Sequence, residues 1–286
     1  MLNDDELLRY SRQLMLEEFD IPGQERLKAA SVLVAGLGGL GSPAAMYLAS
    51  SGVGRLVLAD GDAVELSNLQ RQPAHGETSL GMNKAQSAAA TLRNINSTID
   101  VEVLAQDLEE DGLAGLLQGI DLVVDATDNY PVRFALNRAC MQHRIPMVSA
   151  AAVRSEGQLA VFHPALGGPC YRCLYPEAGQ ATALNCRDSG VLAPVVGVLG
   201  CLQAMEALKV LSGFGEPLYA GLLVMDLRTL SVQRLALAPR ADCPHCAAFR
   251  SPCAPRIHPA PAPRHPAVTA TGVAVSPPVA TPPAHQ

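Results

Sequence analysis

A glycine-rich turn between a buried strand and a helix is the strongest constraint on how this 286-residue chain can fold. The apolar run 32–35 leads into Gly36-Leu37-Gly38-Gly39-Leu40-Gly41, and a helix of small residues follows over 43–51. Glycines at this spacing let the backbone turn tightly and bring its N–H groups close to phosphates at a helix N-terminus. A second strand, 55–59, ends at Asp60, roughly 20 residues on, where a carboxylate can bind ribose hydroxyls. The pattern predicts a nucleotide-binding βαβ unit but does not choose between NAD and ATP.

The remaining elements predict a sheet with two different halves. Expected helices cover 6–16, 85–94, 132–143 and 194–211. Expected strands cover 101–105, 122–125 and 147–151, and then 158–162, 222–226 and 232–237. The first three strands alternate with helices and the last three do not, so we expect a Rossmann-like α/β fold whose sheet is parallel in its N-terminal half and antiparallel in its C-terminal half. We assign this domain to residues 1–250.

The last 36 residues differ in composition from the rest of the chain. Residues 251–286 contain ten prolines, many alanines and no acidic residue, so they cannot build a core. We predict a disordered tail there.

Charge and hydropathy exclude several classes of partner. The formal net charge of −6 argues against general binding of nucleic acids or anionic membranes. The N-terminus is acidic where a signal peptide is basic, and we find no apolar run of the roughly 18 residues that a membrane span needs. We expect a cytoplasmic protein.

Cationic residues after the second strand favour ATP over NAD. A triphosphate carries about four negative charges, which are met by Arg, Lys and a magnesium ion. Asn68, Arg71 and Lys84 can supply polar and cationic contacts. Asp128 follows the strand 122–125 at the sheet edge where ligands bind in open α/β folds, so it is a candidate Mg²⁺ ligand. On these residues NAD stays open, since Arg71 and Lys84 could equally be solvated surface charges.

Two Cys-x-x-Cys pairs predict a metal site. Cys170 and Cys173 are separated by 69 residues from Cys243 and Cys246. Four thiolates suit tetrahedral zinc with no open coordination position, which indicates a structural site that ties the end of the domain back to its middle. The alternative is two redox pairs or free thiols.

Cys186 is a separate candidate. Arg187 beside it favours the thiolate, which is the reactive form of a cysteine. The alternative is a spectator cysteine in a mobile loop.

Five motifs, in this order, resemble the ThiF/MoeB/HesA family of sulfur-carrier adenylyltransferases, which is related to ubiquitin-activating enzymes. The resemblance runs from about residue 5 to residue 248. The motifs are Arg9-Tyr10-Ser11-Arg12-Gln13, the glycine loop, Leu66-Ser67-Asn68-Leu69-Gln70-Arg71-Gln72, Ala126-Thr127-Asp128-Asn129 and the paired Cys-x-x-Cys.

The resemblance implies roles for individual residues. Asp60 would hold the ribose of ATP, while Asp128 would organise Mg²⁺ and be essential for adenylylation. Arg12 would act as an arginine finger in the neighbouring subunit of a homodimer, although by itself it is typical of a helix-surface charge. Phosphate contacts would come from Asn68, Arg71 and Lys84, and the wider ATP site would include Gly36, Gly38, Gly39, Gly41, Gln72 and Asn129.

The implied reaction is ATP-dependent adenylylation of the C-terminal glycine carboxylate of a ubiquitin-like sulfur carrier. The runs 170–174 and 185–187 look closer to the ThiF branch, so we expect a ThiS-like carrier of thiamine thiazole synthesis, with Cys186 implicated in sulfur transfer. A MoeB-type enzyme with a MoaD-like carrier, which does not require Cys186, is the alternative. No rhodanese-like domain follows the core, so we expect a separate sulfurtransferase or cysteine desulfurase. An NAD-dependent oxidoreductase and a non-catalytic carrier-binding scaffold remain as alternatives from other classes.

Overall fold

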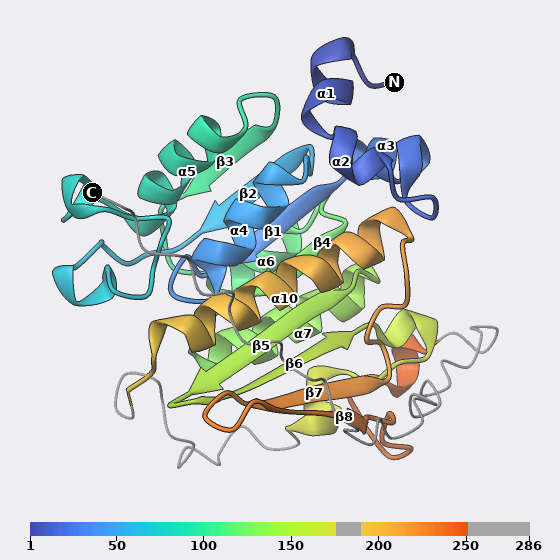
Figure 1. Ribbon diagram of the computed structural model, residues 1–286. Coiled ribbons are helices and arrows are strands. Elements are labelled where there is room, and N and C mark those ends of the chain that lie inside the picture. Colours follow the sequence, from blue (N-terminus) through green and yellow to red (C-terminus); the bar gives the residue numbers. More distant parts are fainter. Residues whose placement is uncertain (176–189, 251–286) are drawn as a thin grey trace, which may run out of the picture.

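One sheet forms the centre of the molecule in the computed structural model, which describes residues 1–175 and 190–250 (Figure 1). Within these residues eight strands lie in the order β3-β2-β1-β4-β5-β6-β7-β8. Their bounds are β1 Ser31–Ala35, β2 Arg55–Ala59, β3 Asp100–Leu104, β4 Leu122–Asp125, β5 Met147–Val153, β6 Glu156–Phe162, β7 Gly221–Asp226 and β8 Ser231–Ala236.

The pairing confirms a mixed sheet. The pairs β3–β2, β2–β1, β1–β4 and β4–β5 are parallel, and the pairs β5–β6, β6–β7 and β7–β8 are antiparallel. Helices connect the parallel strands, because a parallel neighbour can be reached only by a long crossover. Only Arg154 and Ser155 separate β5 from β6, and such a short connection reverses the chain into an antiparallel hairpin.

Helices cover both faces of the sheet. Helices α3, α4, α5 and α10 pack on one face, and α6 and α7 pack on the other (Figure 1). The described helices are α1 Asp4–Arg9, α2 Ser11–Leu14, α3 Asp20–Ala29, α4 Gly41–Ser50, α5 Lys84–Ile95, α6 Glu110–Leu116, α7 Tyr130–His143, α8 Tyr171–Leu174 and α10 Ala193–Ser212. Short 3₁₀ turns are η1 Leu66–Asn68, η2 Glu77–Ser79, η3 Pro164–Leu166 and η4 Ala247–Phe249.

Strand β1 lies at the centre of this core. Val32 and Val34 join the cluster under α4 and α10, whereas Leu33 and Ala35 join the cluster under α6 and α7. All four are completely buried. Burial on both faces explains why the strand is a continuous apolar run rather than an alternating one.

Two helical segments differ from the expectation. The predicted helix 6–16 is divided into α1 and α2 at Tyr10, whose buried hydroxyl accepts a hydrogen bond from Asn96 Nδ2 at 2.8 Å. This long-range contact holds Tyr10 in the interior and outweighs local helix propensity. Helix α6 was not predicted, because its seven residues include Gly112 and Gly115, which disfavour helix.

Helix α10 differs from the expectation that no apolar run is long enough to span a membrane. By length and composition it could cross a membrane, with a mean hydropathy of 1.5 over its most apolar window. Half of that window is buried, and the helix packs on α4, β5 and β6. A core helix meets the same criteria, so this single helix is weak evidence for a membrane span.

Close packing between α10 and the start of α4 yields a stability prediction. A Cβ added at Gly200 would lie 2.4 Å from Leu40 O and 2.5 Å from Pro43 Cγ. We expect Gly200→Ala to lower the free energy of unfolding by about 1–3 kcal/mol through overpacking. Urea denaturation measures this change.

Gly197, three residues away on the same helix, is the matched control. A Cβ there has no neighbour within 4 Å, so Gly197→Ala should leave stability unchanged or raise it by up to about 1 kcal/mol. Equal losses in both variants would contradict the packing of α10 on α4.

Candidate nucleotide site and four-cysteine cluster

The glycine loop leaves β1 where the strand order of the sheet reverses direction. Its first glycine, Gly36, has φ +87, and a Cβ there would lie 2.9 Å from Ala126 O in the loop that follows β4. A Cβ at Gly41 would lie only 1.8 Å from Gly36 O. Both positions therefore require glycine, and the loop delivers the chain directly into the N-terminus of α4, where unpaired N–H groups favour anions.

Asp60, at the end of β2, borders the glycine loop. Its carboxylate accepts hydrogen bonds from the backbone N–H groups of Leu37 at 2.7 Å and Asp62 at 2.9 Å. Burial raises the pKa of Asp60, against the lowering effect of the Leu37 hydrogen bond. The carboxylate thus lies beside the loop where a ribose binds in folds of this kind.

Lys84 is a buried ion-paired lysine rather than a solvated surface charge. It begins α5, is only 6% exposed, and its Nζ lies 2.7 Å from Asp62 Oδ2. Asn83 caps the same helix by accepting from the Ala85 N–H, and its amide nitrogen donates to Asp60 O at 2.8 Å. The lysine is therefore fixed next to the loop that carries Asp60.

Arg71 and Gln72 lie close to Gly39 and Gly38 of the glycine loop. Arg71 is half-buried and donates to Asn68 Oδ1 at 3.2 Å and to Ser67 O at 2.9 Å. Gln72 is 3% exposed, and its Oε1 has no hydrogen-bond partner among the described residues. Its Nε2 lies 3.6 Å from the place of a Cβ on Gly38. Native proteins rarely bury such an atom unpaired, so this acceptor suits a site that a ligand completes.

The loop after β4 reaches the same edge of the sheet. Asp128 is exposed there, and Asn129 accepts from the Val132 N–H at 3.4 Å to cap α7. The contact between Gly36 and Ala126 sets this loop against the glycine loop. The residues predicted to bind the nucleotide therefore gather at the carboxyl ends of β1, β2 and β4; they come from 36–41, 60, 68–72, 84 and 128–129. The two cations among them, Arg71 and Lys84, fit a triphosphate better than a dinucleotide.

Sequence analysis missed three residues that support this edge. Asp62 pairs with Lys84, and Arg133 binds the backbone of the loop after β4. The ring of His75 bonds to Leu37 O and to Ser87 Oγ, both at 2.9 Å, and burial lowers the pKa of this histidine. Isolated residues of these types carry no motif; only the spacing of Asp62 after Asp60 offered a signal.

Arg12, a predicted site residue of the described part of the chain, does not join this edge. Arg12 is exposed on α2, which packs with α3 near the start of β1, at the opposite end of the strand from the glycine loop (Figure 1). Within the described residues, its side-chain contact is Met15 Sδ at 3.9 Å. Cys186 and the predicted tail 251–286 lie outside the described residues.

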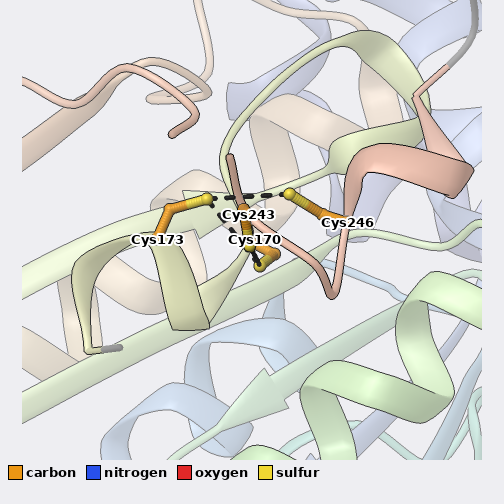
Figure 2. A group of neighbouring side chains, drawn as sticks. All are labelled: Cys170, Cys173, Cys243 and Cys246. Carbon is orange, nitrogen blue, oxygen red and sulfur yellow. Dashed lines mark hydrogen bonds between the residues drawn. The ribbon is translucent and has the colours of Figure 1, made fainter. Parts of the chain in front are cut away.

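The two Cys-x-x-Cys pairs meet in one buried cluster. Figure 2 shows the side chains of Cys170, Cys173, Cys243 and Cys246 converging from two distant segments. The Sγ separations are 3.9 Å for Cys170–Cys173, 3.8 Å for Cys170–Cys243 and 3.6 Å for Cys173–Cys246. Tetrahedral zinc with Zn–S bonds of about 2.3 Å requires about 3.8 Å between sulfurs, so the donor set fits.

The cysteines of the cluster differ in the direction of their pKa shifts, because hydrogen bonds with Cys173 and Cys246, together with burial, raise the pKa of Cys170. Hydrogen bonds with Cys170 and Cys246 lower the pKa of Cys173. Arg250 donates to Cys246 Sγ at 3.0 Å, which places a cation beside a site whose four thiolates would exceed the charge of Zn²⁺. Burial also raises the pKa of Cys140 and Cys201, which lie outside the cluster on α7 and α10.

Three comparisons with known proteins agree with this geometry. The model of the ThiF family matches residues 10–245. The mouse protein adenylyltransferase and sulfurtransferase MOCS3 is 49% identical over 247 residues, covering 86% of this chain and 54% of that relative. The molybdopterin-synthase adenylyltransferase of Escherichia coli K12 is 46% identical over 245 residues, covering 86% of this chain and 98% of the relative. The chain thus spans about half the length of MOCS3.

A solved structure supports the fold alone. The crystal structure of E. coli MccB with ATP aligns with a TM-score of 0.73 at 24% identity, covering 85% of this chain and 75% of MccB.

We predict that the four-cysteine cluster binds one zinc ion tightly in each chain. We expect Cys173→Ser to lose the metal and to lower the thermal midpoint by roughly 10 °C, because metal binding stabilises the folded state. Elemental analysis and thermal unfolding measure both effects.

Cys201→Ser is the control, because Cys201 is a partly exposed cysteine outside the cluster. It should keep the metal. Full zinc content in Cys173→Ser would refute the assignment of this cysteine as a ligand.

Proposed function

The chain belongs to the ThiF family, and from this premise we propose that it adenylylates the C-terminal glycine carboxylate of a ubiquitin-like sulfur carrier, using Mg²⁺ and ATP. The observation that carries the proposal is the buried Lys84, which Asp62 holds next to the loop that carries Asp60, beside the glycine loop. A buried cation at this edge matches a triphosphate. The similarity to the E. coli adenylyltransferase over nearly its whole length supports the same activity.

Each polar residue at the sheet edge has a proposed role. Asp60 would accept hydrogen bonds from the ribose hydroxyls, and Asp128 and Asn129 would hold Mg²⁺ beside the phosphates. Asn68, Arg71 and Lys84 would contact the phosphates, with Gln72 and the N–H groups of Gly38, Gly39 and Gly41 beside them. Gly36, whose N–H donates to Ala59 O, would shape the turn.

The proposed reaction needs no proton transfer. An ionised carboxylate oxygen of the carrier forms a bond to the α-phosphorus as the bond to the β-phosphate oxygen breaks, giving an acyl adenylate and pyrophosphate. Arg71 and Lys84 orient the phosphates and neutralise charge on the leaving group. Magnesium, when bound, supplies further charge neutralisation on the phosphate oxygens. Catalysis is therefore attributed to positioning and electrostatics.

The relatives favour a MoaD-like carrier over the ThiS-like carrier that the sequence runs suggested. Both MOCS3 and the E. coli enzyme are named adenylyltransferases, and the name of the E. coli enzyme gives molybdopterin synthase as its target. Two residues of the run 170–174, Cys170 and Cys173, belong to the four-cysteine cluster, so we attribute this part of the ThiF resemblance to the proposed metal site rather than to carrier choice. The run 185–187 lies outside the described residues. We therefore propose the MoaD-like carrier, with the ThiS-like one as alternative.

The remaining assignments extend this proposal. Arg12, exposed at the far end of β1 from its own glycine loop, would act on the site of a second copy, which makes the homodimer the proposed functional unit. Sulfur would come from a separate sulfurtransferase or cysteine desulfurase. Cys186 would act in sulfur transfer if the carrier is ThiS-like, whereas activation of a MoaD-like carrier would not require it. The proposed location is the cytoplasm.

ATP–pyrophosphate exchange with purified MoaD-like and ThiS-like carriers tests the proposal. We expect exchange with the MoaD-like carrier, and a loss of at least about 100-fold in Asp128→Ala, because removing a group that organises transition-state charge costs this much. The matched control is Asp111→Ala, which removes an exposed carboxylate from α6 and should leave exchange unchanged.

The other results have defined meanings. Exchange only with the ThiS-like carrier would reverse the carrier assignment. Carrier binding without exchange on either protein would overturn the enzymatic proposal in favour of the carrier-binding scaffold.

A further inference from the structure

Asp125 is a completely buried carboxylate at the end of β4, just before the loop that carries Asp128. One oxygen accepts from the Thr127 N–H at 3.2 Å and from Thr127 Oγ1 at 2.7 Å. The other accepts from Ser149 Oγ at 2.6 Å on the neighbouring strand β5. On the opposite face, Gln203 Nε2 of α10 donates to the Asp125 carbonyl at 2.8 Å. The first half of the loop is thus held from both faces of the sheet.

Arg133, in the first turns of α7, completes this arrangement. Its side chain is 7% exposed, and its Nε lies 3.7 Å from Asp125 Oδ2 and 3.1 Å from the Thr127 carbonyl oxygen. Its Nη2 donates to the same carbonyl and to Ala150 O at 3.1 Å. Its Nη1 donates to Tyr171 Oη at 3.4 Å. Every polar group of Thr127, the residue before Asp128, is therefore bonded to Asp125 or Arg133.

Tyr171 connects this network to the four-cysteine cluster. It lies between Cys170 and Cys173, and its ring is completely buried. Its backbone N–H donates to Asn137 Oδ1 at 2.8 Å on α7, the helix that also carries Arg133. The segment fixed by the cysteines thus supplies one of the acceptors that orient the guanidinium.

We infer that Arg133 is a positioning residue for Asp128, and that Tyr171 connects its orientation to the four-cysteine cluster. A buried ion pair adds little net stability, because desolvation of both charges offsets their attraction. Five donors in a planar fork can instead fix several carbonyl groups at once, which a lysine or an apolar side chain cannot do. The inference deepens the proposed function, since Asp128 is its proposed Mg²⁺ ligand.

Hydrogen–deuterium exchange tests the positioning without any need for activity. In Arg133→Met and in Tyr171→Phe we expect faster amide exchange at residues 126–129, with a larger effect in Arg133→Met. The control is Leu27→Ala, a truncation in the hydrophobic cluster under α4 and α10 at the opposite end of β1, which should speed exchange around α3 but not at 126–129.

The Mg²⁺ dependence of ATP–pyrophosphate exchange provides the second readout. Groups that orient a metal ligand typically alter metal affinity by about 10–100-fold when removed, so we expect Arg133→Met to raise the free Mg²⁺ concentration at half-maximal exchange by at least about 10-fold. Tyr171→Phe, which loses only one hydrogen bond, should raise it by about 3-fold. The KM for the carrier should change less than about 2-fold in both, and Leu27→Ala should leave the Mg²⁺ requirement unchanged.

The two readouts separate this inference from the proposed function. Unchanged amide exchange at 126–129 in Tyr171→Phe and in Arg133→Lys would overturn the positioning role, even if Arg133→Met failed to fold. Faster amide exchange with an inactive wild-type protein would support the positioning role and reject the adenylylation proposal. A Mg²⁺ requirement that rises equally in Leu27→Ala would reduce Arg133 to a general stabilising residue.

Discussion

The close passage of two loops, at Gly36 and Ala126, determines where chemistry can occur in this fold. Strands β1 and β4 lie side by side and parallel, but the chain leaves β1 toward α4 on one face and leaves β4 toward α7 on the other. The loops must therefore diverge, and the opening between them is where open α/β sheets bind ligands. A side chain at position 36 would collide with the Ala126 carbonyl at 2.9 Å. Packing against the loop after β4 therefore requires glycine at position 36, whether or not a phosphate binds there.

The cysteine cluster fixes the other half of the molecule. Beyond β5 the sheet is antiparallel, and the cysteine pairs lie in two segments that are far apart in the sequence. A metal at the four thiolates would join the segments around residues 170 and 245 and so stabilise this half of the fold. The cluster then serves the nucleotide site indirectly, because Tyr171 inside the first knuckle contacts Arg133, and Arg133 binds the loop before Asp128.

Local sequence patterns predicted most of the fold, and long-range contacts explain the remainder. The glycine spacing, the continuous apolar run of β1 and the Cys-x-x-Cys pairs each carry their structural meaning within a few residues, so their elements were expected correctly. The division at Tyr10 could not be foreseen, because Asn96 holds its hydroxyl from 86 positions away. The sequence also did not indicate whether Lys84 is buried or solvated. Its burial becomes evident only from its ion pair with Asp62 in the folded structure. Carrier choice depends on surfaces that recognise another protein, and no motif of this chain encodes it alone.

The most direct test of the account is to follow which phosphate reaches the carrier. The protein is incubated with the MoaD-like carrier and ATP labelled either at the α- or at the γ-phosphorus, and the carrier is separated and treated with hydroxylamine to trap an acyl adenylate. The account predicts that the α-label, and not the γ-label, is found on the carrier, and that hydroxylamine releases it as AMP. Transfer of the γ-label would show a phosphoryl transfer to the carrier and would contradict the proposed use of the site between β1 and β4.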